Sequence, residues 1–221
     1  MSEGHETPIR VVFFGDSICV GQGVSIHKGW VTRLAARIED IARDEHREIV
    51  VVNASVNGST TRQALERMPY EVQAQGVDYL LVQFGLNDCN YWQTDGGLPR
   101  VRLQAFEANL DEILERAFCF GARRAILNTN HPTVRTKIPM PGTSLTYEDS
   151  NRAYNAAIRA VAARWADRVD LNDVESHIRA LVDRGETRIE DLLQPDGLHL
   201  SVRGHEVYFS LVCPLLERLL G

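Results

Sequence analysis

The chain has 221 residues, of which 44% are hydrophobic and 24% are charged, and this composition is that of an ordinary globular protein large enough to bury a core. Its formal net charge is −6 and it has no basic stripe, so nucleic acid and anionic membrane surfaces are not expected as its partners. No linker divides the chain, and we predict one domain over residues 1–221 with residues 1–8 as a flexible N-terminal tail. This tail is short and polar and has no apolar segment typical of a secretion signal, so a cytoplasmic location is expected. The oligomeric state stays open.

Apolar runs alternate with amphipathic stretches along the whole chain. The runs expected to be strands are 9–14, 49–53, 78–84, 124–128 and 169–171. The stretches expected to be helices are 30–44, 60–68, 103–120, 146–166 and 201–220. This alternation predicts an α/β fold, with a parallel sheet between layers of helices.

The four cysteines are far apart and lack the spacing of a metal site. Cys119 and Cys213 lie in apolar helical patterns, so we expect them to be buried as small hydrophobic side chains. Cys19 and Cys89 each follow a polar motif closely and are expected to be reduced thiols without a role in chemistry.

Polar motifs follow each of the first three predicted strands. They are Gly15-Asp16-Ser17, Asn57-Gly58 and Gly85-Leu86-Asn87-Asp88. Ligands of parallel α/β sheets bind beyond the carboxyl ends of the strands, so neighbouring strands would bring these three loops to one place. Each motif alone is also compatible with an ordinary turn or helix cap.

A serine, a histidine and an aspartate supply the parts of a nucleophilic site. A serine hydroxyl needs a base that takes its proton, and that base needs an acid that fixes its tautomer. Ser17 is the candidate nucleophile, and Asp196 and His199, three residues apart in a Pro- and Gly-containing segment, are the candidate acid and base. His205 competes for the role of base, but it falls inside a predicted helix, so His199 is favoured.

Acyl transfer also needs donors for the negative charge that develops on the carbonyl oxygen. The backbone N–H groups of Ser17 and Gly58 and the side-chain amide of Asn87 are the candidate oxyanion donors.

The three polar motifs and the segment Asp196-Gly197-Leu198-His199 form a set of four. In order and spacing, this set resembles the four motifs of the SGNH (GDSL-type) hydrolase family, and the resemblance spans residues 9 to about 215. It implies a flavodoxin-like three-layer α/β/α sandwich, a five-stranded parallel sheet in the order 2-1-3-4-5, and neither a metal nor an organic cofactor. It also implies Ser17, His199 and Asp196 as the catalytic triad, and Ser17, Gly58 and Asn87 as the oxyanion hole. One departure is that Ala54 and Ser55 stand where the family often has a glycine, which affects the path of the loop more than the chemistry.

Two irregular segments, 88–99 and 131–145, are expected to shape the substrate pockets. The candidate substrate-binding residues are Asp16, Arg62, Trp92 and His131. Trp92 either stacks on a sugar or anchors its own loop, His131 either contacts substrate or fixes a loop, and Arg62 either faces an anion or is a solvated charge.

Neither segment has a long apolar stripe, so the sequence predicts an esterase that removes a small acyl group, such as acetyl, from a carbohydrate or glycoconjugate. The alternatives are a short-chain thioesterase or lysophospholipase, and an acyltransferase that uses the same residues. A nucleotide- or flavin-binding module fits poorly because the first loop is neither a Walker loop nor GxGxxG. A catalytically silent sugar-binding domain also fits poorly, because it would be expected to have lost one of four residues that are all present: Ser17, Asn87, Asp196 and His199.

Overall fold

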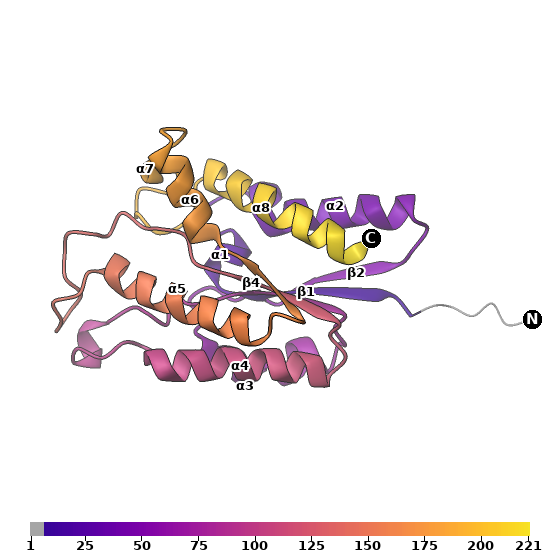
Figure 1. Cartoon of the computed structure of the whole chain (residues 1–221), viewed down its shortest axis with the longest axis horizontal. Helices are drawn as coiled ribbons and strands as arrows, with labels where there is room; N and C mark the ends of the chain where they lie inside the picture. Colours follow the sequence, from indigo (N-terminus) through magenta and orange to yellow (C-terminus); the bar gives the residue numbers. More distant parts are fainter. Residues whose placement is uncertain (1–6) are drawn as a thin grey trace, which may run out of the picture.

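A five-stranded parallel sheet forms the centre of the computed structural model, which describes residues 7–221 (Figure 1). The strands are β1 (Ile9–Gly15), β2 (Ile49–Asn53), β3 (Tyr79–Gln83), β4 (Arg124–Asn128) and β5 (Val169–Asn172). Their order is β2-β1-β3-β4-β5, and every pair is parallel, which confirms the predicted fold class and strand order. Of the tail expected over residues 1–8, residues 1–6 lie outside the described residues.

Helices cover both faces of this sheet. The helices are α1 (Ser17–Val20), α2 (Trp30–Asp44), α3 (Thr61–Met68), α4 (Leu103–Cys119), α5 (Tyr147–Arg164), α6 (Val174–Asp183), α7 (Ile189–Leu192) and α8 (Val202–Leu220). Short helical turns lie at Ile26–Lys28, Pro69–Gln73 and Gln93–Asp95. In Figure 1, α2 and α8 pack together on one side of the sheet, and α3, α4 and α5 lie on the other.

The inner strand β1, between β2 and β3, is buried on both faces because helices cover it from both sides. Val11, Val12, Phe13 and Phe14 are fully buried, as expected for a parallel strand with an uninterrupted apolar sequence. Trp30, the first residue of α2, packs edge-on against Phe13 of β1, so this contact joins the helix to the sheet.

The strand order brings the carboxyl ends of the first three strands together. Phe13 of β1 is in register with Asn53 of β2, and Gly15 is in register with Gln83 of β3. The loops that carry Ser17, Gly58 and Asn87 therefore leave the same edge of the sheet, as the chain order of the motifs predicts.

Helix α6 and the two cysteines of the later helices differ from the sequence-based expectations. Residues 174–183 were not expected to form a helix. Cys119 is exposed and Cys213 is half-buried, whereas Cys19 and Cys89 are buried, and all four are free thiols. Cys119 lies two residues, or roughly 200° of helical rotation, beyond the buried Ala117, and this places it on the solvent side of α4.

Within residues 7–221, no helix combines the length and the apolar character that a membrane crossing requires.

Candidate active site

Ser17 is the first residue of the short helix α1, at the carboxyl end of β1. Asp16 caps this helix, since its Oδ1 accepts the N–H of Ile18 at 2.9 Å. A Cβ atom on Gly15 would lie 2.5 Å from Cys19 Sγ and 2.8 Å from the backbone oxygen of Gln83. Only glycine therefore allows β1 to turn this sharply into the helix that presents Ser17.

The structure aligns Ser17, His199 and Asp196 in one hydrogen-bonded row. His199 Nε2 lies 3.1 Å from Ser17 Oγ, and His199 Nδ1 lies 2.6 Å from Asp196 Oδ2. A carboxylate accepts only, so Nδ1 carries a proton toward Asp196 and Nε2 is left to accept the proton of the Ser17 hydroxyl. Ser17 is 7% exposed, so this row ends in a hydroxyl that is nearly enclosed yet open to solvent.

Asp196 is held as an anion by the loop that it belongs to. Its Oδ1 accepts the backbone N–H groups of Leu198 and His199 at 2.8 and 2.9 Å. Partial burial acts to raise the pKa of Asp196, but the hydrogen bond to His199 and these two N–H groups together lower it. The acid therefore stays charged while it orients the imidazole.

His205, the competing candidate for the base, lies in the core of the protein and contacts Trp30. It is buried in α8, and its Nδ1 lies 3.4 Å from the backbone nitrogen of Trp30. Burial lowers the pKa of His205 to about 4. Its place among core side chains leaves His199 as the histidine beside Ser17.

Asn87 links the residues that flank the other two candidate oxyanion donors. Its Nδ2 lies 3.2 Å from Asp16 Oδ2 and 3.2 Å from the backbone oxygen of Ser59. Gly58 is exposed and has a φ of 74°, a left-handed conformation that favours glycine. Within residues 7–221, the backbone N–H groups of Ser17 and Gly58 donate to no other protein group, so both are available to a ligand.

Two buried carboxyl groups lie directly behind these donors. Burial raises the pKa of Asp16 to about 7, and the charge of Asp88 acts in the same direction. Burial also raises the pKa of Asp88 to about 6, although its Oδ1 accepts the N–H and hydroxyl of Thr61. Asp16 is fully buried and its oxygens accept hydrogen bonds from Ile18 and Asn87, so the structure gives this candidate substrate-binding residue a supporting place behind Ser17.

His131 is also buried, and this decides between the two interpretations of its role. Its Nε2 lies 2.7 Å from the backbone oxygen of Leu198, and its Nδ1 lies 2.8 Å from the hydroxyl of Tyr208. Because it is 1% exposed and both ring nitrogens are engaged, it fixes a loop and does not contact substrate. The loop that it fixes carries His199.

Arg135 holds the same loop from the solvent side. Its Nε and Nη2 donate to the backbone oxygen of Asp196 at 3.2 and 3.0 Å. Its guanidinium also lies over the ring of Tyr147, whose hydroxyl donates to the backbone oxygen of Leu86 beside Asn87. No local sequence pattern singles out Arg135 or Tyr147, because their partners lie some 60 residues away along the chain.

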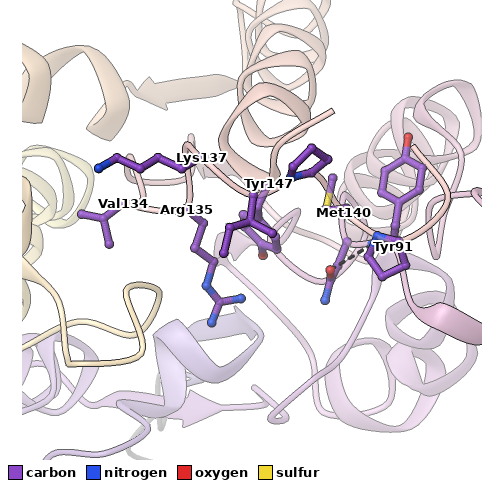
Figure 2. A pocket seen from close by; sticks show the side chains of 10 residues that line it. Tyr91, Val134, Arg135, Lys137, Met140 and Tyr147 are labelled. Atoms are coloured by element: carbon purple, nitrogen blue, oxygen red, sulfur yellow. Dashed lines mark hydrogen bonds between the residues drawn. The ribbon is translucent and has the colours of Figure 1, made fainter. Parts of the chain in front are cut away.

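Arg135 and Tyr147 also line a cavity of about 490 Å³. The two irregular segments expected to shape the substrate pockets both line it, through Asn90 and Tyr91 from one and through Val134, Arg135 and Lys137–Pro141 from the other. In Figure 2, Tyr91 and Met140 lie at one end of this view, Val134 and Lys137 at the other, and Arg135 between them. The cavity thus combines aromatic and apolar walls with amide and cationic groups, next to the loop of Asp196.

Arg62 and Trp92 lie at the protein surface. Trp92 is 49% exposed, and the guanidinium of Arg100 lies 4.1 Å from the centre of its ring. Arg100 also donates from Nη1 to the backbone oxygen of Gly58 at 3.3 Å. Arg62 is exposed and lines a cleft together with Arg100, so the structure keeps open a contact of Arg62 with an anionic group.

Within residues 7–221, no group of three or more His, Cys, Asp or Glu side chains is arranged to hold a metal ion.

Residues 13–207 match the profile of the GDSL-like lipase/acylhydrolase family. The chain belongs to this family, and it is a carboxylic ester hydrolase of the SGNH type. The resemblance seen in the sequence motifs is therefore confirmed.

Individual relatives are distant but match over most of their length. Esterase TesA of Pseudomonas aeruginosa is 25% identical over 93% of this chain and 87% of its own. The isoamyl acetate-hydrolyzing esterase 1 homolog of Mus musculus is 27% identical over 95% of this chain and 82% of its own. The acetylxylan esterase Axe2 of Geobacillus stearothermophilus is similar in structure, with a TM-score of 0.72, 21% identity and 93% coverage of both chains. At this identity the last comparison shows the fold alone.

Proposed function

We propose that this esterase uses Ser17 as nucleophile, His199 as base and Asp196 as the acid that orients it, and that it removes a small acyl group, acetyl foremost, from a carbohydrate or glycoconjugate. The observation that carries the proposal is the row of contacts from Asp196 Oδ2 through His199 to Ser17 Oγ, at 2.6 and 3.1 Å. These are the distances that proton transfer from the serine requires.

The reaction runs through an acyl-enzyme. Ser17 Oγ attacks the acyl carbon while its proton passes to His199 Nε2, and a tetrahedral intermediate forms. His199 returns this proton to the departing alcohol oxygen as the ester bond breaks, which leaves the acyl group on Ser17. Water then attacks the acyl carbon while its proton passes to His199 Nε2. His199 returns this proton to Ser17 Oγ as the acyl bond to Ser17 breaks, so the carboxylic acid leaves and Ser17 is regenerated.

The oxyanion of each intermediate is stabilised by the N–H groups of Ser17 and Gly58 and by the amide of Asn87. The two backbone donors have no partner elsewhere in residues 7–221. The Asn87 amide lies between Asp16 and Ser59, so it turns one hydrogen from Ser59 or Asp16 to the oxyanion when substrate binds. Each such donor contributes about 10²–10³ to the rate.

The enclosed position of Ser17 and the composition of the 490 Å³ cavity support the small acyl group and the sugar. Ser17 as a residue is 7% exposed, and this enclosed position favours a small acyl group beside its hydroxyl. Asn90, Tyr91, Arg135 and Tyr147 offer the polar and aromatic groups with which proteins bind sugar rings. Two proteins of similar structure, one of them Axe2, are named acetylxylan esterases.

A longer acyl chain is the second candidate, because the same cavity has an apolar rim. Ile138 is 81% exposed, and Pro139, Met140 and Pro141 continue the rim. Among the relatives, the Escherichia coli protein that is 24% identical is named thioesterase 1/protease 1/lysophospholipase L1. An acyltransferase would use the same triad with a sugar in place of water.

Hydrolysis of p-nitrophenyl acetate, butyrate and octanoate by the wild type and by Ser17→Ala tests these alternatives. We expect acetate to react fastest, the Ser17→Ala variant to lose at least about a thousandfold in kcat, and intact-mass spectra to show an acetyl group on the wild type alone. Ser210→Ala is the matched control, because Ser210 is exposed on α8 and its hydroxyl, among residues 7–221, binds only the backbone of Val207. Turnover that survives Ser17→Ala refutes the nucleophile, fastest turnover of octanoate favours the second candidate, and a persistent acyl-serine without turnover points to a transferase.

A further inference from the structure

Three arginines line one cleft of about 290 Å³ beside the Gly58 loop. Arg62 lies in the first turn of α3, Arg102 directly precedes α4, and Arg100 lies two residues before it. Helices α3 and α4 pack against each other (Figure 1), and residues at the N-terminal ends of both line this cleft. Leu98, Pro99 and Ala105 supply its apolar surface.

Among residues 7–221, no ion pair neutralises the positive charge of this cleft. Within residues 7–221, none of the three arginines forms an ion pair, whereas elsewhere on the surface Arg124 and Arg164 each bind a carboxylate. Asp95 is the one carboxylate of the described residues that lines the cleft, and its Oδ2 accepts the N–H of Trp92. A chain with a net charge of −6 thus keeps three unpaired guanidinium groups together beside its active site. The positive ends of two helix dipoles add to this local field.

Contacts inside the protein hold one of these arginines and leave the other two available. Arg100 lies over Trp92 at 4.1 Å and donates to the backbone oxygen of Gly58 at 3.3 Å. Arg62 and Arg102 are exposed and make no side-chain hydrogen bond with the described residues. Through Arg100, the cleft is therefore connected to the loop of Gly58, a candidate oxyanion donor. The guanidinium groups of Arg62 and Arg102 face solvent and are available to a ligand.

We infer that this cleft binds an oxyanion group, a carboxylate or a phosphate, carried by the alcohol part of the ester. This inference rests on the proposed function and names its substrate class: an acylated acidic sugar. Guanidinium groups bind carboxylate and phosphate oxygens with two parallel hydrogen bonds, which gives both affinity and orientation. Leu98 and Pro99 line the same cleft and offer apolar contacts to the carbon atoms that carry the anion.

Turnover of matched esters tests the preference for an anion. The substrates are an acetylated hexose, the corresponding acetylated hexuronic acid and the acetylated hexose phosphate. We expect the wild type to have a kcat/KM about tenfold or more higher for one of the charged esters than for the neutral one, because hydrogen bonds to charged groups are strong. In the double variant Arg62→Gln/Arg102→Gln this ratio falls toward one. Arg43→Gln is the matched control, because Arg43 is exposed on α2 and pairs with Asp40.

Direct binding separates a failure of this inference from a failure of the proposed function. Calorimetric titration with the unacetylated hexuronic acid and with inorganic phosphate needs no turnover. We expect binding by the wild type and by Ser17→Ala, weakened about tenfold or more in the Arg62→Gln/Arg102→Gln variant, and the tighter ligand identifies the source of the anion. No binding of either ligand, or equal binding by the double variant, overturns the inference. Loss of Ser17-dependent acetate release from all three esters overturns the proposed function alone.

Discussion

His131 Nε2 lies 2.7 Å from the backbone oxygen of Leu198, the residue directly before His199. A carbonyl oxygen only accepts, so Nε2 carries the proton and Nδ1 accepts the hydroxyl proton of Tyr208. Burial lowers the pKa of His131 to about 4, which keeps the ring neutral in this tautomer. A buried, neutral imidazole thus fixes the backbone that places the imidazole of His199 beside Ser17.

Replacing His131 with phenylalanine tests this support. The ring volume is kept, but both hydrogen bonds are lost, and the buried oxygens of Leu198 and Tyr208 are left without a partner. We expect kcat for p-nitrophenyl acetate to fall about tenfold with a smaller change in KM, and the free energy of unfolding to fall by about 2–4 kcal/mol.

Two further variants show whether the effect on kcat passes through Leu198. His131→Gln keeps an amide donor and is expected to recover part of kcat. Tyr208→Phe removes only the bond to Nδ1 and should cost less kcat than His131→Phe. An equal loss of kcat in all three variants would mean that general destabilisation, and not the contact with Leu198, is responsible.

The same residue predicts a pH dependence of stability. The pKa of His131 is about 4 in the folded protein and about 6.5 in an unfolded chain, so the unfolded chain binds more protons between these values. The contribution of His131 is therefore complete above pH about 6.5 and is lost as the pH falls toward 4. His131→Phe does not titrate, so its deficit in unfolding free energy should be smaller at pH 5 than at pH 7 by about 2 kcal/mol.

This comparison is needed because other buried groups work in the opposite direction. The raised pKa values of Asp16 and Asp88, about 7 and 6, give a contribution that is present in acid and lost as the pH rises. His205, with a pKa of about 4, acts like His131. The pH dependence of wild-type stability therefore contains contributions from all of these groups. Unfolding the wild type and His131→Phe in urea at pH 5 and pH 7, and comparing their free energies of unfolding, isolates the contribution of His131. Parallel pH profiles of the two proteins would refute the assignment.

The sequence predicted the sheet and the candidate triad because both rest on local patterns. The apolar run 9–14 and the motif after it place Ser17 at a strand end whatever the rest of the chain does. Helix α6 could also have been predicted from the sequence, because Asp173 is a typical N-cap residue and Val174 and Ile178 are apolar residues at helical spacing. In contrast, the role of His131 was left between substrate contact and loop support, because only the fold brings it to Leu198. The cleft lined by Arg62, Arg100 and Arg102 was missed for the same reason: Arg62 lies on α3 and Arg102 directly before α4, and only the fold brings them together.

Asn87→Ala tests the amide as an oxyanion donor. The amide lies between Asp16 and the backbone of Ser59, so its removal takes away the side-chain donor next to the reacting carbonyl. We expect kcat to fall about 10²–10³ with little change in KM, because the donor acts on charge that develops in the transition state. Asn109→Ala is the matched control, since this amide on α4 donates to Thr61. Similar losses of kcat in the two variants would show that Asn87 acts through stability.

Arg135 is expected to act through Asp196, whose backbone oxygen accepts from both Nε and Nη2. Arg135→Met removes both donors and should lower kcat about five- to tenfold, because the carboxylate that orients His199 is held less firmly. Arg135→Lys keeps the charge and one donor and should recover part of the loss. Arg188→Met is the control, because Arg188 is exposed and, in the part of the chain that the structure describes, pairs only with Glu190.

A double-mutant cycle with Asp196→Asn separates this role from a contact with substrate. If Arg135 works by holding Asp196, Arg135→Met has little further effect on kcat once Asp196 is replaced. Arg135 also lines the 490 Å³ cavity, and a contact with the alcohol part of the ester would instead raise KM equally in both backgrounds. Additive losses in kcat would contradict the coupling, because two residues of one hydrogen-bonded unit are not expected to act independently.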